Sequence, residues 1–369
     1  MAAARVPGLS MLLALGLGAG ACDGGDARGY DVARAPVTIR GVGSAASRAL
    51  FVKWAEQYAQ VDPATTVTYD AAGSGAGVQA ALEGSAAFGV SDAPLSDADA
   101  TAHRGFWSAP LGPQASGAAY ADVLHLPVAV EAIAVVYALA GAGASRLQIS
   151  EDVLADMLTG RTRYWDDPAL AAQNPGSKLP HVAVRPLYRG DESGSSYRLA
   201  EWLSKTSKRW GIQPSRSIVL AGGAAVQKEA GMLAGLRADD GALGYLSAAT
   251  AMSEHVTSFA VRNPAGRFVP PSLEGLRAAA ATADLGPDLR ADPIAAPGDL
   301  SYPVCSFTFV LLRADGEGGR RALARFLWWA THDGQAFAPP LGFGALPGEL
   351  QLRDEGVLHA LRAAGGPAL

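Results

Sequence analysis

The sequence predicts an α/β protein in which parallel sheets are covered by helices. Short apolar segments alternate with longer segments of helical spacing along the chain after residue 35, which is the pattern of such sheets. The length of 369 residues gives room for about two domains. Thirty basic against thirty-five acidic side chains give a net charge of −5, which lacks the basic excess of a nucleic-acid-binding protein. A 49% hydrophobic composition excludes a disordered chain.

The first residues read as an export signal. Arg5 precedes an apolar stretch over residues 9–17, and small residues lead to Cys22. This end of the stretch resembles the lipobox of bacterial lipoproteins, although Ala19 stands where Leu is usual. The resemblance implies a lipoprotein signal peptide over residues 1–21 and lipidation of Cys22. We therefore expect a protein in the periplasm or at the cell surface, lipid-anchored to the membrane; an ordinary signal peptide is the alternative.

The elements follow in order after a flexible tether at residues 22–35. We predict strands at residues 37–39, 67–69, 88–90, 132–137, 182–187, 217–220, 243–246, 259–262 and 306–312. We predict helices at residues 45–60, 75–84, 151–159, 194–206, 224–236, 318–332 and 350–363. Residues 264–297 are expected to be mostly loop, with a short helix near residues 273–276. Residues 126–144 are apolar apart from Glu131, and Pro127 and the β-branched side chains favour two consecutive buried strands over a membrane span.

One local pattern recurs three times: a strand, a turn rich in Gly and Ser, and an amphipathic helix. The turns lie at residues 41–44, 73–77 and 189–195. The first turn of a helix has unpaired N–H groups and a partial positive charge, glycine lets a ligand approach the backbone, and serine hydroxyls can donate. Each serine alone could simply cap its helix. Three such turns together, one of them with Arg189, predict a site for a small oxyanion.

Other motifs in the sequence are weaker evidence for a function. Residues 73–77 imitate a dinucleotide fingerprint, but the spacing is G-x-G-x-G rather than G-x-G-x-x-G. Ser74 or Ser193 could be a hydrolase nucleophile, yet none of the six scattered histidines stands out as its base. Residues 189–191 spell Arg-Gly-Asp, which we interpret as coincidental because three residues often recur by chance. A surface adhesin built on the same fold is a further alternative. No H-E-x-x-H or C-x-x-C motif occurs, so we predict neither a metal site nor a cofactor.

A family resemblance follows from segments spread in order over the chain. The segments are residues 41–44, 53–54, 73–77, 88–96, 158–160, 165–167, 174–176, 178–180, 189–195, 241–245 and 302–303. They resemble the phosphate-binding protein of bacterial phosphate ABC transporters. This implies a two-lobed periplasmic-binding-protein fold of type II, each lobe a mostly parallel sheet flanked by helices, with ligand in the interlobe cleft. Lobe I would comprise residues 36–131 and 303–369, and lobe II residues 132–302.

The resemblance also implies which residues would bind phosphate. They are Ser44, Ala45, Ala46, Ser74, Asp92, Arg189, Asp191, Ser193, Gly194 and Ser195. Arg189 would supply a guanidinium held by Asp191. Asp92 would accept a hydrogen bond from protonated phosphate and reject sulfate, which carries no proton. Ala45 and Ala46 stand where the family usually has Thr-Phe, and either Ser44 or Ser47 could replace the missing hydroxyl.

The predicted function is that of a receptor, not an enzyme. We expect a monomer that binds inorganic phosphate, delivers it to ABC permease subunits with a cytoplasmic ATPase, and binds no nucleic acid. A binding protein for another oxyanion, a phosphate sensor and a secreted serine hydrolase are the alternatives. With Cys22 lipidated, Cys305 would have no partner, and its strand-like surroundings predict a buried thiol.

Overall fold

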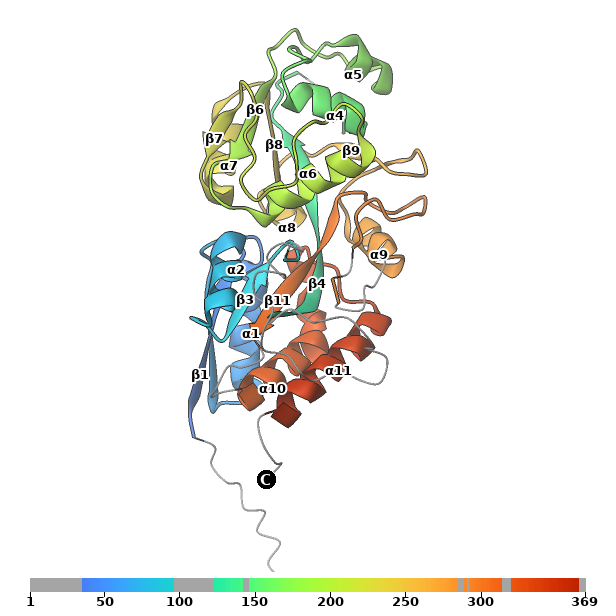
Figure 1. Ribbon diagram of the computed structural model, residues 1–369. Coiled ribbons are helices and arrows are strands. Elements are labelled where there is room, and N and C mark those ends of the chain that lie inside the picture. Colours follow the sequence, from blue (N-terminus) through green and yellow to red (C-terminus); the bar gives the residue numbers. More distant parts are fainter. Residues whose placement is uncertain are drawn as a thin grey trace, which may run out of the picture. The chain divides into compact units, whose positions relative to one another are not determined.

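The computed structural model of the chain describes residues 35–95, 123–141, 146–283, 289–290, 292–313 and 320–364 (Figure 1). The predicted signal peptide, Cys22, the tether up to residue 34, and Ser96 lie outside the described residues. Residues 36–369 form one compact unit. None of the helices in the described ranges combines the length and the apolar character that a membrane span requires.

An eight-stranded sheet runs in the order β2-β1-β3-β11-β4-β8-β6-β7. Its strands are β1 (Val37–Gly43), β2 (Thr65–Asp70), β3 (Phe88–Ser91), β4 (Val123–Tyr137), β6 (Arg185–Arg189), β7 (Ala224–Val226), β8 (Ala242–Ser247) and β11 (Cys305–Arg313). The pairs at both ends of this order are parallel, and the pairs that involve β4 or β11 are antiparallel. A second sheet has the order β10-β9-β5. Its strands are β5 (Gln148–Ile149), β9 (Ala260–Arg262) and β10 (Phe268–Val269).

Strand β4 joins two groups of elements. Its residues 123–132 pair with β11, and its residues 133–137 pair with β8. In Figure 1, β4 and β11 run from the group with β1–β3 into the group with β6–β8. The prediction of two consecutive strands here was wrong, because one strand of 15 residues, buried at every position, replaces them. Pro127 lies where the register with β11 shifts, which accommodates a residue that cannot donate to the ladder.

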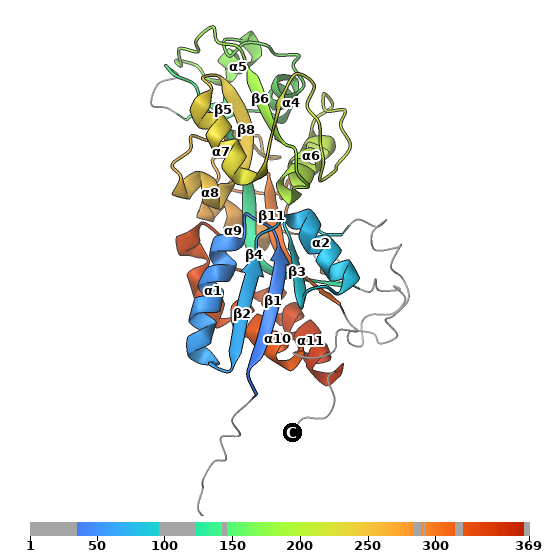
Figure 2. The same ribbon diagram turned by 90° about the vertical axis from the view of Figure 1, so that its left-hand side faces the viewer.

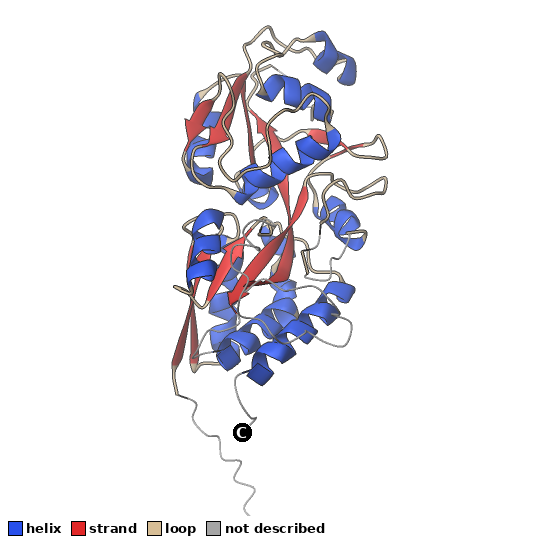
Figure 3. Ribbon diagram, viewed as in Figure 1, coloured by secondary structure: helices blue, strands red, loops and turns tan. Residues whose placement is uncertain are grey.

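Helices flank the strands of both groups (Figures 2 and 3). The helices are α1 (Arg48–Val61), α2 (Ser74–Glu83), α4 (Glu151–Leu158), α5 (Pro168–Gln173), α6 (Gly194–Thr206), α7 (Lys228–Ala238), α8 (Ala248–Ser253), α9 (Leu273–Ala281), α10 (Arg320–Thr331) and α11 (Gly348–Ala364), with short 3₁₀ turns at Asp333–Phe337 and Pro339–Leu341. Helix α1 packs on β2, α2 on β1 and β3, α6 on β4 and β8, and α7 on β6 and β8.

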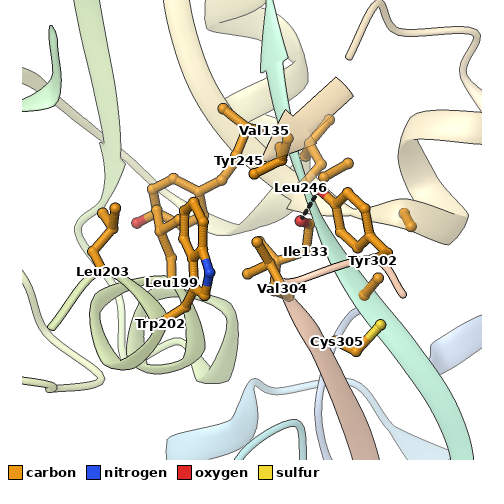
Figure 4. Close-up of a cluster of buried hydrophobic side chains, with 14 of the residues drawn as sticks. Ile133, Val135, Leu199, Trp202, Leu203, Tyr245, Leu246, Tyr302, Val304 and Cys305 are labelled. Carbon is orange, nitrogen blue, oxygen red and sulfur yellow. Dashed lines mark hydrogen bonds between the residues drawn. The ribbon is translucent and has the colours of Figure 1, made fainter. Parts of the chain in front are cut away.

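Periodic apolar positions explain the long helices. In α1, the buried side chains are Leu50, Phe51, Trp54 and Tyr58, which the spacing places on one face. These side chains join one of two buried clusters, which also contains side chains of α10. The other cluster lies around β4, β8 and α6, and Figure 4 shows the rings of Trp202, Tyr245 and Tyr302 within it. There the Tyr302 hydroxyl donates to the Ile133 carbonyl oxygen at 2.9 Å, which links the return of the chain to β4.

Two other predicted elements differ from the structure. Residues 217–220 form no strand, although Ile218 and Leu220 are buried, because β6 pairs instead with residues 224–226. Helix α7 therefore begins at Lys228 rather than at residue 224. The predicted buried thiol is confirmed: Cys305 is fully buried at the start of β11, and burial raises the pKa of its thiol.

Candidate functional site

The first half of the candidate site is built from the ends of β1 and β3 and the start of α2. Gly43 ends β1, and the next residue, Ser44, donates its N–H to the Val90 carbonyl oxygen at 3.0 Å. A Cβ atom on Gly77 would lie 2.9 Å from the Gly43 Cα atom, so only glycine lets α2 pack this closely on the strand ends. This packing brings Ser74, the first residue of α2, beside Asp92, which follows β3.

Asp92 is buried among hydroxyl groups. The Ser74 hydroxyl donates to Asp92 Oδ2 at 3.2 Å, and the Ser306 hydroxyl donates to the Asp92 carbonyl oxygen. Burial raises the pKa of the Asp92 carboxyl, while the hydroxyls of Ser44 and Ser74 favour its charged form and oppose that rise. No N–H or hydroxyl group of the described residues donates to Asp92 Oδ1, and the Asp92 carboxyl also has a hydrogen-bond interaction with Glu131. A buried carboxyl oxygen without a donor is an acceptor position that a protonated ligand can fill.

The second half is built from the end of β6 and the start of α6. Ser193 precedes α6, and its hydroxyl accepts from the Ser196 N–H at 3.3 Å, which is an N-cap contact. Gly194 and Ser195 are the first residues of the helix, and both are buried. The N–H groups of this first turn carry the partial positive charge of the helix.

Arg189 ends β6 and is buried, whereas its partner Asp191 is half-buried. The Arg189 Nε atom donates to Asp191 Oδ1 at 2.7 Å, and a second guanidinium nitrogen contacts Asp191 Oδ2. The Asp191 Oδ1 atom also accepts from the Lys228 N–H at 2.9 Å. Burial opposes the charge of Asp191, but Arg189 and this N–H outweigh it and hold the pKa of Asp191 below its ordinary value. Burial likewise opposes the charge of Arg189, and the contact with Asp191 nevertheless raises its pKa. The guanidinium is therefore a fixed positive charge.

The two halves meet at the starts of α2 and α6, and Figure 2 shows one end of α6 next to α2. A Cβ atom on Gly194 would lie 2.7 Å from Ser74 Oγ, 2.8 Å from Asp92 Cβ and 3.1 Å from Asp92 Oδ2. A Cβ atom on Gly75 would lie 2.0 Å from Glu192 Oε2 and 2.6 Å from Glu192 Cβ. The structure thus brings Ser44, Ser74, Asp92 and Gly194 together. Two helix starts, two hydroxyls and a carboxylate therefore lie next to one another.

The remaining predicted residues lie on neighbouring segments of the chain: Arg189 and Asp191 before α6, and Ala45 and Ala46 before α1. Arg189 is tied to α6 through Tyr245, whose hydroxyl accepts from the Arg189 N–H at 3.0 Å and lies 2.7 Å from Ser196 Oγ. Ala45 and Ala46 form a turn before α1, which begins at Arg48 and not at residue 45. The Ala46 N–H donates to Ser44 Oγ at 3.2 Å.

Ser44 and Ser47 make different contacts in this turn. The Ser47 hydroxyl lies 3.4 Å from Thr308 Oγ1, on the side of β11. The Ser44 hydroxyl instead favours the charged form of Asp92. Of the two serines, Ser44 is the one that interacts with Asp92.

Sequence reasoning missed two acidic residues at the site. Glu229, on α7, accepts from the Ser247 N–H at 2.7 Å, and its charge acts on both Asp92 and Arg189. Glu131, on β4, is buried, and its charge state is linked to that of Asp92. Glu131 had a signal in the sequence, since it is the lone charge of a long apolar segment, whereas Glu229 lies in an ordinary amphipathic helix.

Comparison with known proteins agrees with this architecture. The family model of the PBP superfamily domain matches residues 31–333. The phosphate-binding protein PstS of Pasteurella multocida is 30% identical over 319 residues, which cover 85% of this chain and 87% of that protein. The chain belongs to the PBP superfamily, in the PstS family of phosphate-binding proteins.

Relatives of this PstS family member extend to the archaea. The PstS protein of Methanocaldococcus jannaschii is 28% identical over 325 residues, covering 81% of this chain and 79% of that protein. Among solved structures, the phosphate-binding protein of Stenotrophomonas maltophilia matches with a TM-score of 0.67 at 16% identity, over 88% of this chain and 93% of that chain. A high-affinity periplasmic phosphate-binding protein, PfluDING, solved with bound phosphate, matches with a TM-score of 0.65 at 16% identity, over 87% and 93%. The predicted two-lobed α/β fold is confirmed.

Proposed function

We propose that this chain binds inorganic phosphate between the starts of α2 and α6 and delivers it to an ABC permease. The observation that carries the proposal is the meeting of Ser74, Asp92 and Gly194 at one point in a chain of the PstS family. Relatives named phosphate-binding protein PstS align over 85% of the chain, which supports phosphate as the ligand.

The donors and acceptors of the site fit a protonated oxyanion. The N–H groups at the start of α6, the hydroxyls of Ser44 and Ser74, and the guanidinium of Arg189 would donate to phosphate oxygens. Asp92 Oδ1, which receives no N–H or hydroxyl group among the described residues, would accept the proton that phosphate retains at neutral pH. Sulfate has no proton to give, so Asp92 would oppose it with a second acceptor.

Ala45, Ala46, Asp191, Ser193 and Ser195 complete the proposed ligand set. Asp191 would act by holding Arg189, and Ser193 by capping α6. The contacts of the two serines discussed as nucleophiles favour binding over hydrolysis. Ser74 donates to Asp92, and Ser193 accepts from the backbone of α6.

We also propose the division into lobes and the cellular context. Lobe I would comprise residues 36–131 and 303–369, and lobe II residues 132–302; the change of partner along β4, from β11 to β8, supports this division. Residues 1–21 would be removed as a signal peptide, residues 22–35 would tether the chain, and Cys22 would carry the lipid that anchors a monomer to the membrane. Closure of the lobes on phosphate would create the form that the permease subunits and their ATPase recognise.

Calorimetry on protein freed of bound phosphate tests the proposed ligand. We expect phosphate to bind with a Kd below about 1 µM, which corresponds to about 8 kcal/mol of binding free energy. Arsenate, which also retains a proton, should compete, and sulfate should give no heat at the same concentrations. Equal binding of sulfate and phosphate would contradict the role of Asp92, and binding of neither would contradict the proposed function.

A further inference from the structure

Glu131 lies behind Asp92 in the wall of the site. It stands opposite Ser306 in the ladder between β4 and β11, and the Ser306 hydroxyl donates to the Asp92 carbonyl oxygen. The Glu131 side chain is only 2% exposed. No N–H or hydroxyl group of the described residues donates to either of its carboxyl oxygens. Its hydrogen-bond interaction is with the Asp92 carboxyl, which requires a proton on one of the two groups. An ionised carboxylate buried without donors is costly, so its state of protonation needs an explanation.

The charged groups around Glu131 favour its neutral form. Burial raises the pKa of Glu131 well above its ordinary value, and the negative charges of Asp92 on the chain after β3 and Glu229 on α7 raise it further, as does the hydrogen bond with Asp92. Tyr69 on β2 and Cys305 on β11 also interact with Glu131, and burial raises the pKa of both. Arg198 on α6 opposes them, but this guanidinium is already paired with Glu201 and Asp292.

Asp92 and Glu131 differ in what stabilises their charge. The hydroxyls of Ser44 and Ser74 favour a charged Asp92, and Ser74 Oγ reaches Asp92 Oδ2 at 3.2 Å. Glu131 has no such donor among the described residues. When two neighbouring buried carboxyls compete for one proton, the proton stays on the one whose ionised form is less well solvated. That carboxyl is Glu131.

We propose that Glu131 is a positioning residue that retains a proton behind Asp92 and thereby keeps the Asp92 carboxylate ionised as the acceptor for the ligand. This inference rests on the proposed function, because the ligand is phosphate. Loss of the Glu131 proton would place a second negative charge next to the bound anion. Phosphate affinity would then fall at the pH at which Glu131 ionises.

Infrared spectroscopy of the free protein tests the proton directly. We expect a carbonyl stretch of a protonated carboxyl at about pH 7 that shifts when the protein is labelled with [¹³C]glutamate and that is missing from Glu131→Gln. Asp354→Asn is the matched control, since Asp354 on α11 is also a fully buried carboxyl without partners among the described residues. That variant should lose a band that glutamate labelling does not shift. A wild-type protein without a glutamate band would overturn the proposal, and this measurement on the wild type does not depend on the folding of any variant.

Calorimetry with phosphate tests what the proton does. At about pH 7, Glu131→Gln should keep the wild-type Kd within about threefold, because the amide copies a neutral acid. If Glu131 were ionised, the same change would remove a negative charge and tighten phosphate binding by about tenfold or more, which would overturn the proposal. As pH rises, the ratio of the two Kd values cancels the titration of phosphate itself. Wild-type binding should weaken relative to Glu131→Gln at the pH at which the glutamate band disappears, and a band lost without that change would contradict the proposal.

The proposed function and the proposed role of Glu131 fail in different ways. If the glutamate band is present but no phosphate binds at any pH, the proposed function is wrong while the proton on Glu131 stands. If phosphate binds tightly and the band is missing, the function stands and the inference about Glu131 is wrong.

Discussion

At the scale of single residues, short motifs predict much of the site. Ser74, Asp92 and Arg189 lie in segments where the same few residues make the turn and carry the polar group, so the local sequence contains both signals. Glu131 and Glu229 approach from β4 and α7, and only the fold brings them to Asp92. Their partners lie far away in the chain, so no local spacing could have predicted the contact.

Asp92 allows the sharpest test of ligand choice. Asp92→Asn should weaken phosphate binding by about ten- to hundredfold, because a hydrogen bond to a charged acceptor is lost. The amide can donate, so the same variant should gain affinity for sulfate. Competitive calorimetry with both anions measures the two changes, and weaker binding of phosphate with no gain for sulfate would show that Asp92 does not exclude it.

Arg189 and Arg185 form a natural pair on β6. Arg189 is 5% exposed and held by Asp191, whereas the Arg185 side chain is 57% exposed and pairs with Asp239. Arg189→Ala should weaken binding of every oxyanion by about a hundredfold, since it removes a desolvated charge. Arg185→Ala should leave the calorimetric Kd within about twofold, because exposed ion pairs contribute little. Similar losses in both variants would mean that charge near the site matters and geometry does not.

Asp354 should make the stability of the protein depend on pH. Burial raises the pKa of this carboxyl well above its ordinary value. Its contribution to stability is therefore fully present below the ordinary pKa of about 4 and is lost as pH rises through the raised value. Asp354→Asn should raise Tm above neutral pH and flatten its decline with pH, as measured by calorimetric scans. A Tm difference that does not change with pH would contradict the assignment.

At the scale of elements, periodicity predicts helices well and strand partners poorly. The apolar spacing of α1, α2 and α6 places these helices within a few residues of their observed bounds. Buried and exposed side chains alternate along residues 217–220 as they do in a strand. Residues 224–226 nevertheless pair with β6. Several distant segments can pair with the same strand, so the sequence of one segment does not predict which of them pairs with it.

The start of α6 allows a test of the approach between two elements. A Cβ atom on Gly194 would lie 2.7 Å from Ser74 Oγ, so Gly194→Ala should hold the two helix starts apart. Overpacking of this kind costs about 1–3 kcal/mol, and we expect phosphate binding to weaken by about ten- to hundredfold. The Tm of the free protein should hardly change, while the rise in Tm on adding phosphate should shrink.

Gly356 is the matched control for this variant. It lies within α11, and a Cβ atom there would meet nothing within 4 Å. Gly356→Ala should leave phosphate affinity unchanged and raise stability by up to about 1 kcal/mol through helix propensity. Equal losses of affinity in both glycine variants would show that the contact at Gly194 is not what matters.

At the scale of the whole molecule, the alternation of apolar segments correctly predicts the α/β class. That both groups of elements share β4 could not be predicted, because the apolar run of residues 126–144 fits two strands as well as one long strand. One long strand forms here because β11 pairs with its first part and β8 pairs with its second part.

The predicted lipid anchor is attached to the sulfur atom of Cys22, so the location of the protein should depend on this residue. Cys22→Ala should move the protein from the membrane fraction to the soluble fraction, because it removes the acylated sulfur. Cys305→Ala is the control and should leave the distribution unchanged, since this thiol is fully buried in β11. Fractionation with detection of the attached acyl chain measures both. A Cys22 variant that still carries lipid would contradict the prediction.

Strand β4 has a consequence for how the chain comes apart. Because residues 123–132 and residues 133–137 belong to one uninterrupted strand, each with its own partner, no loop separates the two ladders. Loss of the hydrogen bonds to β11 or to β8 removes a pairing partner from part of β4, and this destabilises the remaining part of the same strand. The protein should therefore unfold in a single cooperative transition, unlike a protein whose domains unfold independently.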